Sequence, residues 1–178
     1  DNSRDLCAFY EREEGGNIYF RVALYDLARG AEHSGLNIYL AIDCALGGQT
    51  FLPDFMDCTT DHAWELCLNI YQAGTNYGTD YRLYDKNFNN VTSGYLGSYF
   101  NSQLDAVEFG LSRQTLIDAG WNGGSTLLFQ PFTNKDGGTS GCPGHSKITD
   151  ACVDQDRGCS DGVLNGAIAS SDTAGLVY

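Results

Sequence analysis

Residues 17–27, NIYFRVALYDL, decide the fold, because apolar and polar side chains alternate along them. The two faces of this stretch carry Ile18, Phe20, Val22 and Leu24 on one side and Tyr19, Arg21, Ala23 and Tyr25 on the other. A repeat of two residues is typical of a β-strand, whose successive side chains point to opposite faces of a sheet. We therefore predict a strand with one apolar face that packs on a core.

The same alternation recurs through the first two-thirds of the chain. In residues 36–43, LNIYLAID, one face carries the apolar side chains of Leu36, Ile38, Leu40 and Ile42. Further strands are predicted at residues 6–10, 64–72, 81–85, 106–111 and 125–133. Turns rich in glycine, asparagine and aspartate separate them, which is the spacing of hairpins.

One short helix interrupts the strands. Residues 113–119 follow Ser112, a good N-cap, and stop at Gly120. Many short strands without alternating helices indicate an all-β protein. We predict an antiparallel β-sandwich, jelly-roll-like, with one short helix and an irregular cysteine-rich C-terminal tract.

The 178 residues fit a single domain, but the composition changes near Asn134. We assign residues 1–136 to the β-sandwich domain. Residues 137–178 form a tract rich in cysteine and aspartate with an apolar tail, packed on or extending the same domain. An irregular tract of this length is unusual in a compact domain unless disulfides or a metal hold it. The abrupt apolar ending, GLVY, leads us to expect a fragment of a longer protein.

The formal net charge is −13, from 23 acidic and 10 basic residues. Binding to nucleic acid depends on lysine and arginine at the phosphates, and anionic membrane surfaces repel such a chain. No apolar run approaches the ~20 residues that span a bilayer. We expect neither a nucleic-acid partner nor membrane insertion.

Seven dispersed cysteines with few lysines favour a secreted or cell-surface protein, where disulfides persist. The best local pair is Cys44–Cys58, followed by Cys142 with Cys152 or Cys159. Cys7 and Cys67 lie on predicted strands, where they either bridge or pack as small apolar groups. The count is odd, so at least one thiol is free, pairs with another chain or pairs with residues beyond this chain.

Two acidic segments are candidates for structural Ca²⁺, a cation that prefers several carboxylate oxygens. The first segment supplies Asp43, Asp54, Asp57 and Asp61, and the second supplies Asp150, Asp154, Asp156 and Asp161. The second lacks the glycine and the closing glutamate of an EF-hand. The alternative for both segments is a polar turn with solvated acids.

Aromatic residues are abundant, with eleven tyrosines, nine phenylalanines and two tryptophans. Rings at loop ends can stack on sugar rings while polar neighbours bind the hydroxyls. The candidates for carbohydrate binding are Tyr81, Tyr84, Tyr95, Tyr99 and Trp121. Asn90 begins the glycosylation sequon Asn-Val-Thr. The motifs Gly-x-Ser-x-Gly, His-Glu-x-x-His and the P-loop are absent, so we predict no catalytic residues.

Residues 5–27, DLCAFYEREEGGNIYFRVALYDL, resemble the start of DOMON-type or glucodextranase-like β-sandwich domains, which are similar to family 9 carbohydrate-binding modules. The similarity extends to about residue 136. It implies a jelly-roll-like sandwich that is secreted or displayed on a cell surface, often with structural Ca²⁺. Relatives bind sugars or haem, and many are attached to enzymes that act on polysaccharides.

These observations favour a noncatalytic, calcium-stabilised carbohydrate-binding or accessory module of an extracellular protein, with a polysaccharide or glycan as its partner. The alternative is a structural extracellular protein, such as a filament, lattice or adhesin subunit, that forms a homo-oligomer or polymer by strand addition. An enzyme that uses loop carboxylates ranks only third among these hypotheses, because nothing in the sequence locates a nucleophile or base.

Overall fold

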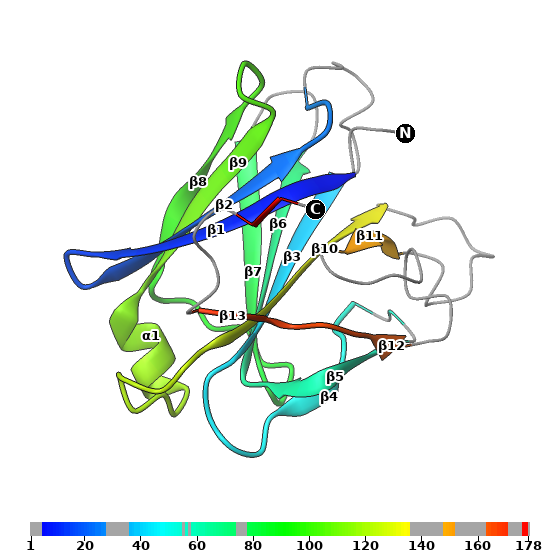
Figure 1. Cartoon of the computed structure of the whole chain (residues 1–178). Coiled ribbons are helices and arrows are strands. Elements are labelled where there is room, and N and C mark those ends of the chain that lie inside the picture. The colour runs from blue at the N-terminus through cyan, green and yellow to red at the C-terminus, as the bar shows by residue number, and fades with distance from the viewer. Residues whose placement is uncertain are drawn as a thin grey trace.

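The computed structural model describes residues 5–27, 36–54, 56, 58–73, 78–135, 148–151, 163–170 and 176–177. In this part of the chain two antiparallel sheets pack together, and a small third sheet lies against the second (Figure 1). The predicted class, antiparallel sheets packed as a β-sandwich with one short helix, is confirmed.

The first sheet has the strand order β14-β1-β2-β9-β8. Its strands are β14 (Leu176–Val177), β1 (Leu6–Glu14), β2 (Asn17–Leu24), β9 (Ala106–Ser112) and β8 (Tyr95–Asn101). All neighbours in this sheet are antiparallel. The turn Gly15-Gly16, with φ of 60° and 80°, joins β1 to β2, because glycine adopts the positive φ of a tight turn without steric cost.

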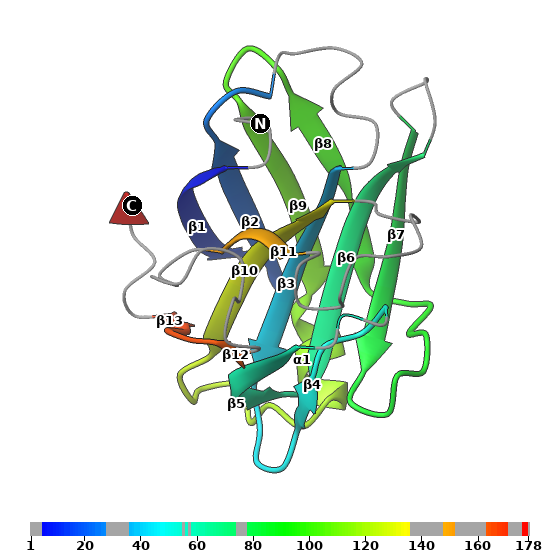
Figure 2. The ribbon, with the colours of Figure 1, turned by 90° about the vertical axis from the view of Figure 1, so that its right-hand side faces the viewer.

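The second sheet has the order β11-β10-β3-β6-β7. Its strands are β11 (Ile148–Ala151), β10 (Leu128–Lys135), β3 (Leu36–Asp43), β6 (Leu66–Ala73) and β7 (Gly78–Asp85), and β13 (Ile168–Ala169) also pairs with β10. The third sheet contains β12 (Val163–Leu164), β5 (Thr59–Trp64) and β4 (Gln49–Phe51), seen in front of the second sheet in Figure 2.

The main core lies between the first two sheets. The apolar faces predicted for β2 and β3 are confirmed: Ile18, Phe20, Val22, Leu24, Leu36, Ile38, Leu40 and Ile42 are all buried there. The Phe20 ring is the centre of an aromatic group, with its centroid 5.4 Å from those of both Phe109 and Phe129. Burying each large apolar side chain contributes roughly 1.5–3 kcal/mol.

A second cluster fills the space between the second and third sheets. Outward side chains of the second sheet, including Tyr39, Cys67 and Phe132, pack there against Met56 and Trp64. Both faces of β3 are therefore covered, and residues 36–42 are buried without exception. The first sheet has no such layer among the described residues.

The helix α1 (Arg113–Asp118) follows the sequence prediction closely. Ser112 adopts an extended conformation and its hydroxyl accepts a hydrogen bond from the Thr115 backbone N–H. Gly120, at φ 116°, ends the turn by donating its N–H to the carbonyl of Ile117. Within the described part of the chain, no helix has the length and apolar composition needed to span a bilayer.

The structure differs from the expected strands at five places. β8 was expected as loop, and β4 and β5 lie in the segment expected as an acidic loop. The predicted strand at residues 64–72 is two strands that break at Glu65. The strand β10 begins at Leu128 rather than at residue 125, and β11 lies inside the tract without alternation. The short strands after residue 147 pair with strands of the first 136 residues.

Candidate functional site

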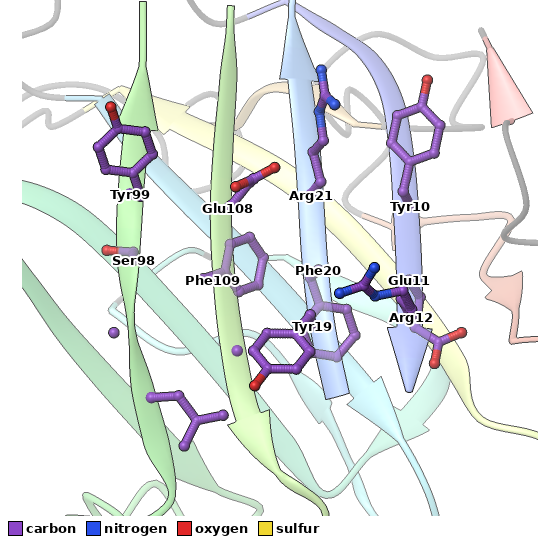
Figure 3. Close-up of a pocket in the computed structure, with 13 residues that line it drawn as sticks. Tyr10, Glu11, Arg12, Tyr19, Phe20, Arg21, Ser98, Tyr99, Glu108 and Phe109 are labelled. Atoms are coloured by element: carbon purple, nitrogen blue, oxygen red, sulfur yellow. The ribbon is translucent and has the colours of Figure 1, made fainter. Parts of the chain in front are cut away.

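A hollow that is open to solvent lies on the outer face of the first sheet (Figure 3). Its volume is about 550 Å³, and β1, β2, β8 and β9 line it. We call it the tyrosine groove and define it by Tyr10, Arg12, Tyr19, Arg21, Leu96, Tyr99 and Glu108. These side chains alternate along the strands with the buried core residues, so the pleat directs them away from the core.

Strand register places four of these residues in one row across the sheet. Tyr99 pairs with Glu108, Glu108 with Arg21, and Arg21 with Tyr10. Figure 3 shows the row running from β8 to β1, with a ring at each end and the two charged side chains between them. Cross-strand neighbours lie ~5 Å apart, so a row of four spans about the length of two or three sugar rings.

A second row lies beside the first, in which Tyr19 stands between Gly110 and Arg12. Gly110 forms the floor, because a Cβ there would lie 3.1 Å from Cδ1 of Tyr19 and 3.2 Å from Cδ1 of Leu96. The absence of a side chain lets these two groups approach each other across β9. The floor of the groove is therefore apolar and shallow.

The polar contacts in the groove orient its side chains. The guanidinium carbon of Arg21 lies 5.7 Å from the ring centroid of Tyr10, a cation–π distance. Arg12 forms an ion pair with Glu14. Asn17 donates from Nδ2 to the Tyr19 hydroxyl at 3.2 Å. The groove thus offers exposed rings, a carboxylate and an arginine, which can stack on a ligand and bind its hydroxyls.

Of the five aromatic residues predicted from sequence, only Tyr99 lies in the groove, where it is 63% exposed. Tyr81 and Tyr95 stack on each other between β7 and β8, with ring centroids 3.9 Å apart. Trp121 is 6% exposed, donates from Nε1 to the Ser125 carbonyl at 2.8 Å and lies under the Arg113 guanidinium. We therefore leave Trp121 out of any ligand site.

Sequence reasoning missed Tyr10 and Tyr19, which lie in the middle of strands rather than in loops. The signal was present, since the alternation of residues 17–27 already places Tyr19 and Arg21 on the face opposite the core. The sequence does not show that β2 pairs with β9 and β9 with β8. These pairings place Glu108 and Tyr99 beside Arg21 in one row.

Asp54 occupies the centre of a hydrogen-bonded group on the outer face of the second sheet. Its carboxylate accepts hydrogen bonds from the hydroxyls of Tyr39 and Tyr84, each at 2.6 Å, and from Nδ2 of Asn69 at 3.3 Å. Arg82 lies 3.5 Å away. Burial, together with the negative charge of Asp54, raises the pKa of Tyr39 well above its ordinary value. Burial and the hydrogen bond to Asp54 raise the pKa of Tyr84 to about 12.

Asp43 lies at the end of β3, near the buried Glu65. The Glu65 carboxylate accepts hydrogen bonds from the backbone N–H groups of Cys44 and Ala45, both at 2.9 Å. Burial, with the Glu65 charge second, raises the pKa of Asp43. The same two causes raise the pKa of the Cys44 thiol to about 12. Glu65 thus fixes the turn that follows β3.

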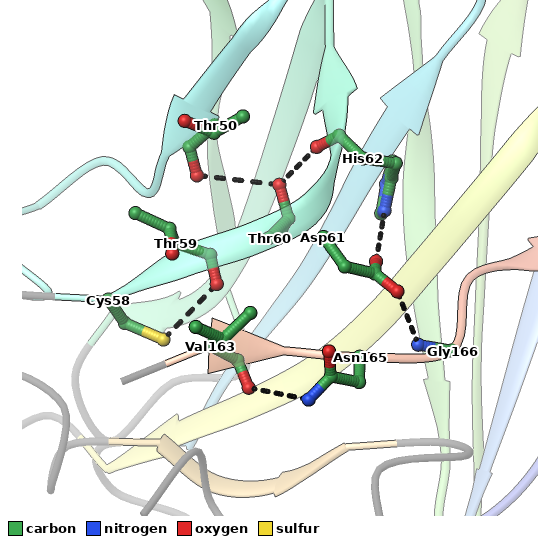
Figure 4. Close-up of polar contacts among 9 residues, drawn as sticks. All are labelled: Thr50, Cys58, Thr59, Thr60, Asp61, His62, Val163, Asn165 and Gly166. Atoms are coloured by element: carbon green, nitrogen blue, oxygen red, sulfur yellow. Dashed lines mark hydrogen bonds and ion pairs between the residues drawn. The ribbon is translucent and has the colours of Figure 1, made fainter. Parts of the chain in front are cut away.

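Asp61 joins the third sheet to the segment after β12 (Figure 4). Its carboxylate accepts from the Gly166 N–H at 3.0 Å and lies 3.1 Å from Nδ1 of His62. Thr60, on the same strand, donates its hydroxyl to the backbone carbonyl of His62. The three described aspartates of the first acidic segment, Asp43, Asp54 and Asp61, therefore have separate surroundings and do not form one cluster.

The calcium prediction depends mostly on side chains that the structure does not describe. Within the described residues, no three histidine, cysteine, aspartate or glutamate side chains gather as a metal-binding group. Only the backbone of Asp150 is described, and the predicted ligands that lie outside the described residues are Asp57, Asp154, Asp156 and Asp161. The Ca²⁺ assignment stays a prediction. Asn90, the sequon residue, is exposed after β7.

The predicted Cys44–Cys58 disulfide is wrong. Cys44 is a buried thiol at the end of β3, and neither it nor Cys7 nor Cys67 forms a disulfide. Cys58 is disulfide-bonded, so its partner is a cysteine other than these three. The spacing of Cys44 and Cys58 indicated a local loop, but the residues between them form β4 of a separate sheet. The predicted pairing among Cys142, Cys152 and Cys159 lies outside the described residues.

No known protein family matches the chain, and no curated protein matches its sequence. The resemblance to DOMON-type sandwich domains accordingly stays a prediction.

Proposed function

We propose that this protein is a noncatalytic carbohydrate-binding or accessory module of a secreted or cell-surface protein, and that the tyrosine groove is its binding site. The observation that carries the proposal is the row Tyr99–Glu108–Arg21–Tyr10 across four strands. The row has the exposed Tyr99 ring at one end, the half-buried Tyr10 ring at the other and hydrogen-bonding groups between them, which matches the alternating apolar faces and hydroxyls of a glycan.

The groove suits a chain more than a small molecule. It is open to solvent on the face of a sheet, and its strands hold the side chains in fixed positions. Rings fixed by a β-sheet lose little conformational entropy on binding, so more of each contact's free energy contributes to affinity along a polymer. The proposed function requires no proton transfer or nucleophile.

Affinity electrophoresis through gels that contain single soluble polysaccharides tests the proposal. We expect retardation by at least one polysaccharide and its loss in Tyr99→Ala. Removal of an anchoring ring from a binding site costs more than ~1 kcal/mol, about a fivefold loss of affinity. No retardation on a broad panel, with the protein folded, contradicts the proposal.

Tyr25 supplies a matched control. It is 65% exposed, close to the value for Tyr99, and it lies outside the groove. Tyr25→Ala therefore removes an equally exposed ring without touching the site. Equal weakening by Tyr25→Ala and Tyr99→Ala contradicts the placement of the ligand in the groove.

We further propose that structural Ca²⁺ stabilises the module through its acidic segments. A ligand at 100 times its dissociation constant adds about 2.7 kcal/mol to the free energy of unfolding. That increase raises the melting temperature by several degrees in a protein of this size. Thermal unfolding in Ca²⁺ and in EDTA measures it, and identical melting curves refute the calcium proposal while leaving the groove untouched.

A second candidate function, assembly as a structural extracellular protein, has one supporting observation. β14 pairs with β1 at Ala8 and Phe9, and among the described strands none pairs with that edge of β1 at residues 12–14. An edge of this kind can accept a strand from another copy. Light scattering with and without chelator and reductant tests assembly, and a monomer under all conditions refutes it.

A further inference from the structure

Arg21 is the central side chain of the tyrosine groove. It lies on β2, between Tyr10 of β1 and Glu108 of β9. Its Nε atom is buried and has no hydrogen-bond partner among the residues that the structure describes. A buried N–H without a partner costs about 1–3 kcal/mol, and no hydrogen bond within the described part of the chain offsets that cost for Arg21.

The described arginines differ in their partners. Three of them have a carboxylate within 4.0 Å: Arg12 with Glu14, Arg82 with Asp54, and Arg113 with Glu13. Arg21 has none within that distance among the described residues, although Glu108 is its register neighbour. In a chain with 23 acidic and 10 basic residues, an arginine without a carboxylate is the exception.

We propose that the groove binds a glycan that carries carboxylate groups, such as a polymer of uronic acids, and that Arg21 binds the carboxylate. This inference rests on the proposed carbohydrate-binding function and narrows its substrate class. A guanidinium presents a planar fork of donors that matches a carboxylate with two parallel hydrogen bonds. Contact with the Tyr10 ring holds the fork in place before the ligand arrives.

The remaining groups of the row complete this assignment. The Glu108 carboxylate is exposed and accepts hydrogen bonds, so it suits a sugar hydroxyl rather than a second anion. Tyr99, beyond it, offers its face to a neighbouring sugar ring. The net charge of −13 weakens the approach of an anion only modestly, because charges further away than ~8 Å are screened at physiological ionic strength.

The test compares two probes with one backbone: polygalacturonate and the same polymer with its carboxylates methyl-esterified. Titration calorimetry is run on the wild type, Arg21→Gln, Arg21→Lys and Arg82→Gln, with folding checked by circular dichroism. Arg82→Gln is the matched control, because it removes the same charge from an arginine on β7, outside the groove. Dextran sulfate is the third probe and separates a carboxylate site from a general anion site.

We expect the wild type and Arg82→Gln to bind polygalacturonate at least tenfold more tightly than the esterified polymer. Arg21→Gln loses this preference, and Arg21→Lys, which keeps the charge but not the fork, recovers only part of it. Equal binding of both polymers, an unaffected Arg21→Gln, an equal loss in Arg82→Gln or a preference for dextran sulfate overturns the inference. If a neutral glycan binds and Tyr99→Ala abolishes that binding, the proposed function stands and only the carboxylate assignment fails.

Discussion

The hydrogen bond between Tyr39 and Asp54 provides the sharpest test of the packing between the second and third sheets. The Tyr39 side chain is 2% exposed, and its hydroxyl donates to Oδ2 of Asp54 at 2.6 Å. Hydrogen bonds to charged groups contribute about 1.5–3 kcal/mol. Asp54→Asn is the suitable perturbation, because Asp54 has φ of 59° and asparagine also tolerates this left-handed conformation.

We expect Asp54→Asn to lower the free energy of unfolding by about 2–3 kcal/mol, since two tyrosine hydroxyls lose an ionised acceptor. For a protein of this length, that loss corresponds to roughly 4–12 °C in melting temperature. Tyr39→Phe removes the hydroxyl that donates to Asp54 and that accepts a hydrogen bond from Nδ2 of Asn69. We expect this change to lower the free energy of unfolding by about 1–2 kcal/mol.

A double-mutant cycle in urea at pH 7 measures the coupling between the two positions. We expect a coupling free energy of about 1 kcal/mol or more, with an unchanged dependence of stability on urea. A second cycle with Tyr84→Phe gives a smaller coupling, because the half-buried Tyr84 hydroxyl can turn to water. Additive effects within about 0.5 kcal/mol in the Tyr39 cycle refute the assigned contact.

Three further predictions concern Cys44, Asp43 and Gly110. The pKa of the Cys44 thiol is 9.0 in the unfolded chain and about 12 in the folded protein, so its contribution to the free energy of unfolding is fully present below pH 9 and is lost as the pH rises to 12. At 1.36 kcal/mol per pH unit the loss is up to about 4 kcal/mol. Between pH 8 and pH 10.5 the urea midpoint should therefore fall less in Cys44→Ala than in the wild type. Because the pKa of Asp43 is raised, its charged form opposes folding, and Asp43→Asn should raise the free energy of unfolding at pH 7 in EDTA but not at pH 3. A lower free energy of unfolding of Asp43→Asn at pH 7 in EDTA contradicts this prediction. Gly110→Ala should displace the Tyr19 ring and so weaken the retardation of the protein in glycan gels, with little change in melting temperature. Unchanged retardation would show that Gly110 does not form the floor of the binding site.

The strands of the core could be predicted from sequence because their two-residue period is a local property. β2 and β3 alternate cleanly, and burial of one face follows from hydrophobicity alone. β8 could not be predicted in this way. Gly97, at φ of 106°, interrupts its pattern, and its strand conformation depends on pairing with β9.

The aromatic residues show why site residues are harder to predict than strands. A tyrosine near a glycine-rich turn can be stacked on a neighbour, as Tyr81 is on Tyr95, or project from the groove, as Tyr99 does. The difference depends on which strand lies alongside, which is a long-range property. The Cys44–Cys58 prediction failed for the same reason, because proximity in sequence does not determine the direction in which each side chain points.

The unequal covering of the two sheets determines where a ligand can bind. The outer face of the second sheet carries Tyr39, Cys67 and Phe132, and these pack under Trp64 and the third sheet. The outer face of the first sheet carries rings as well, but Arg21 and Glu108 lie among them and no described layer covers them. Charged side chains would be costly beneath a third sheet and useful beneath a polar ligand. The outward residues of β2 and β9 are not packed under a described layer, so we propose that the search for a glycan should begin on that face.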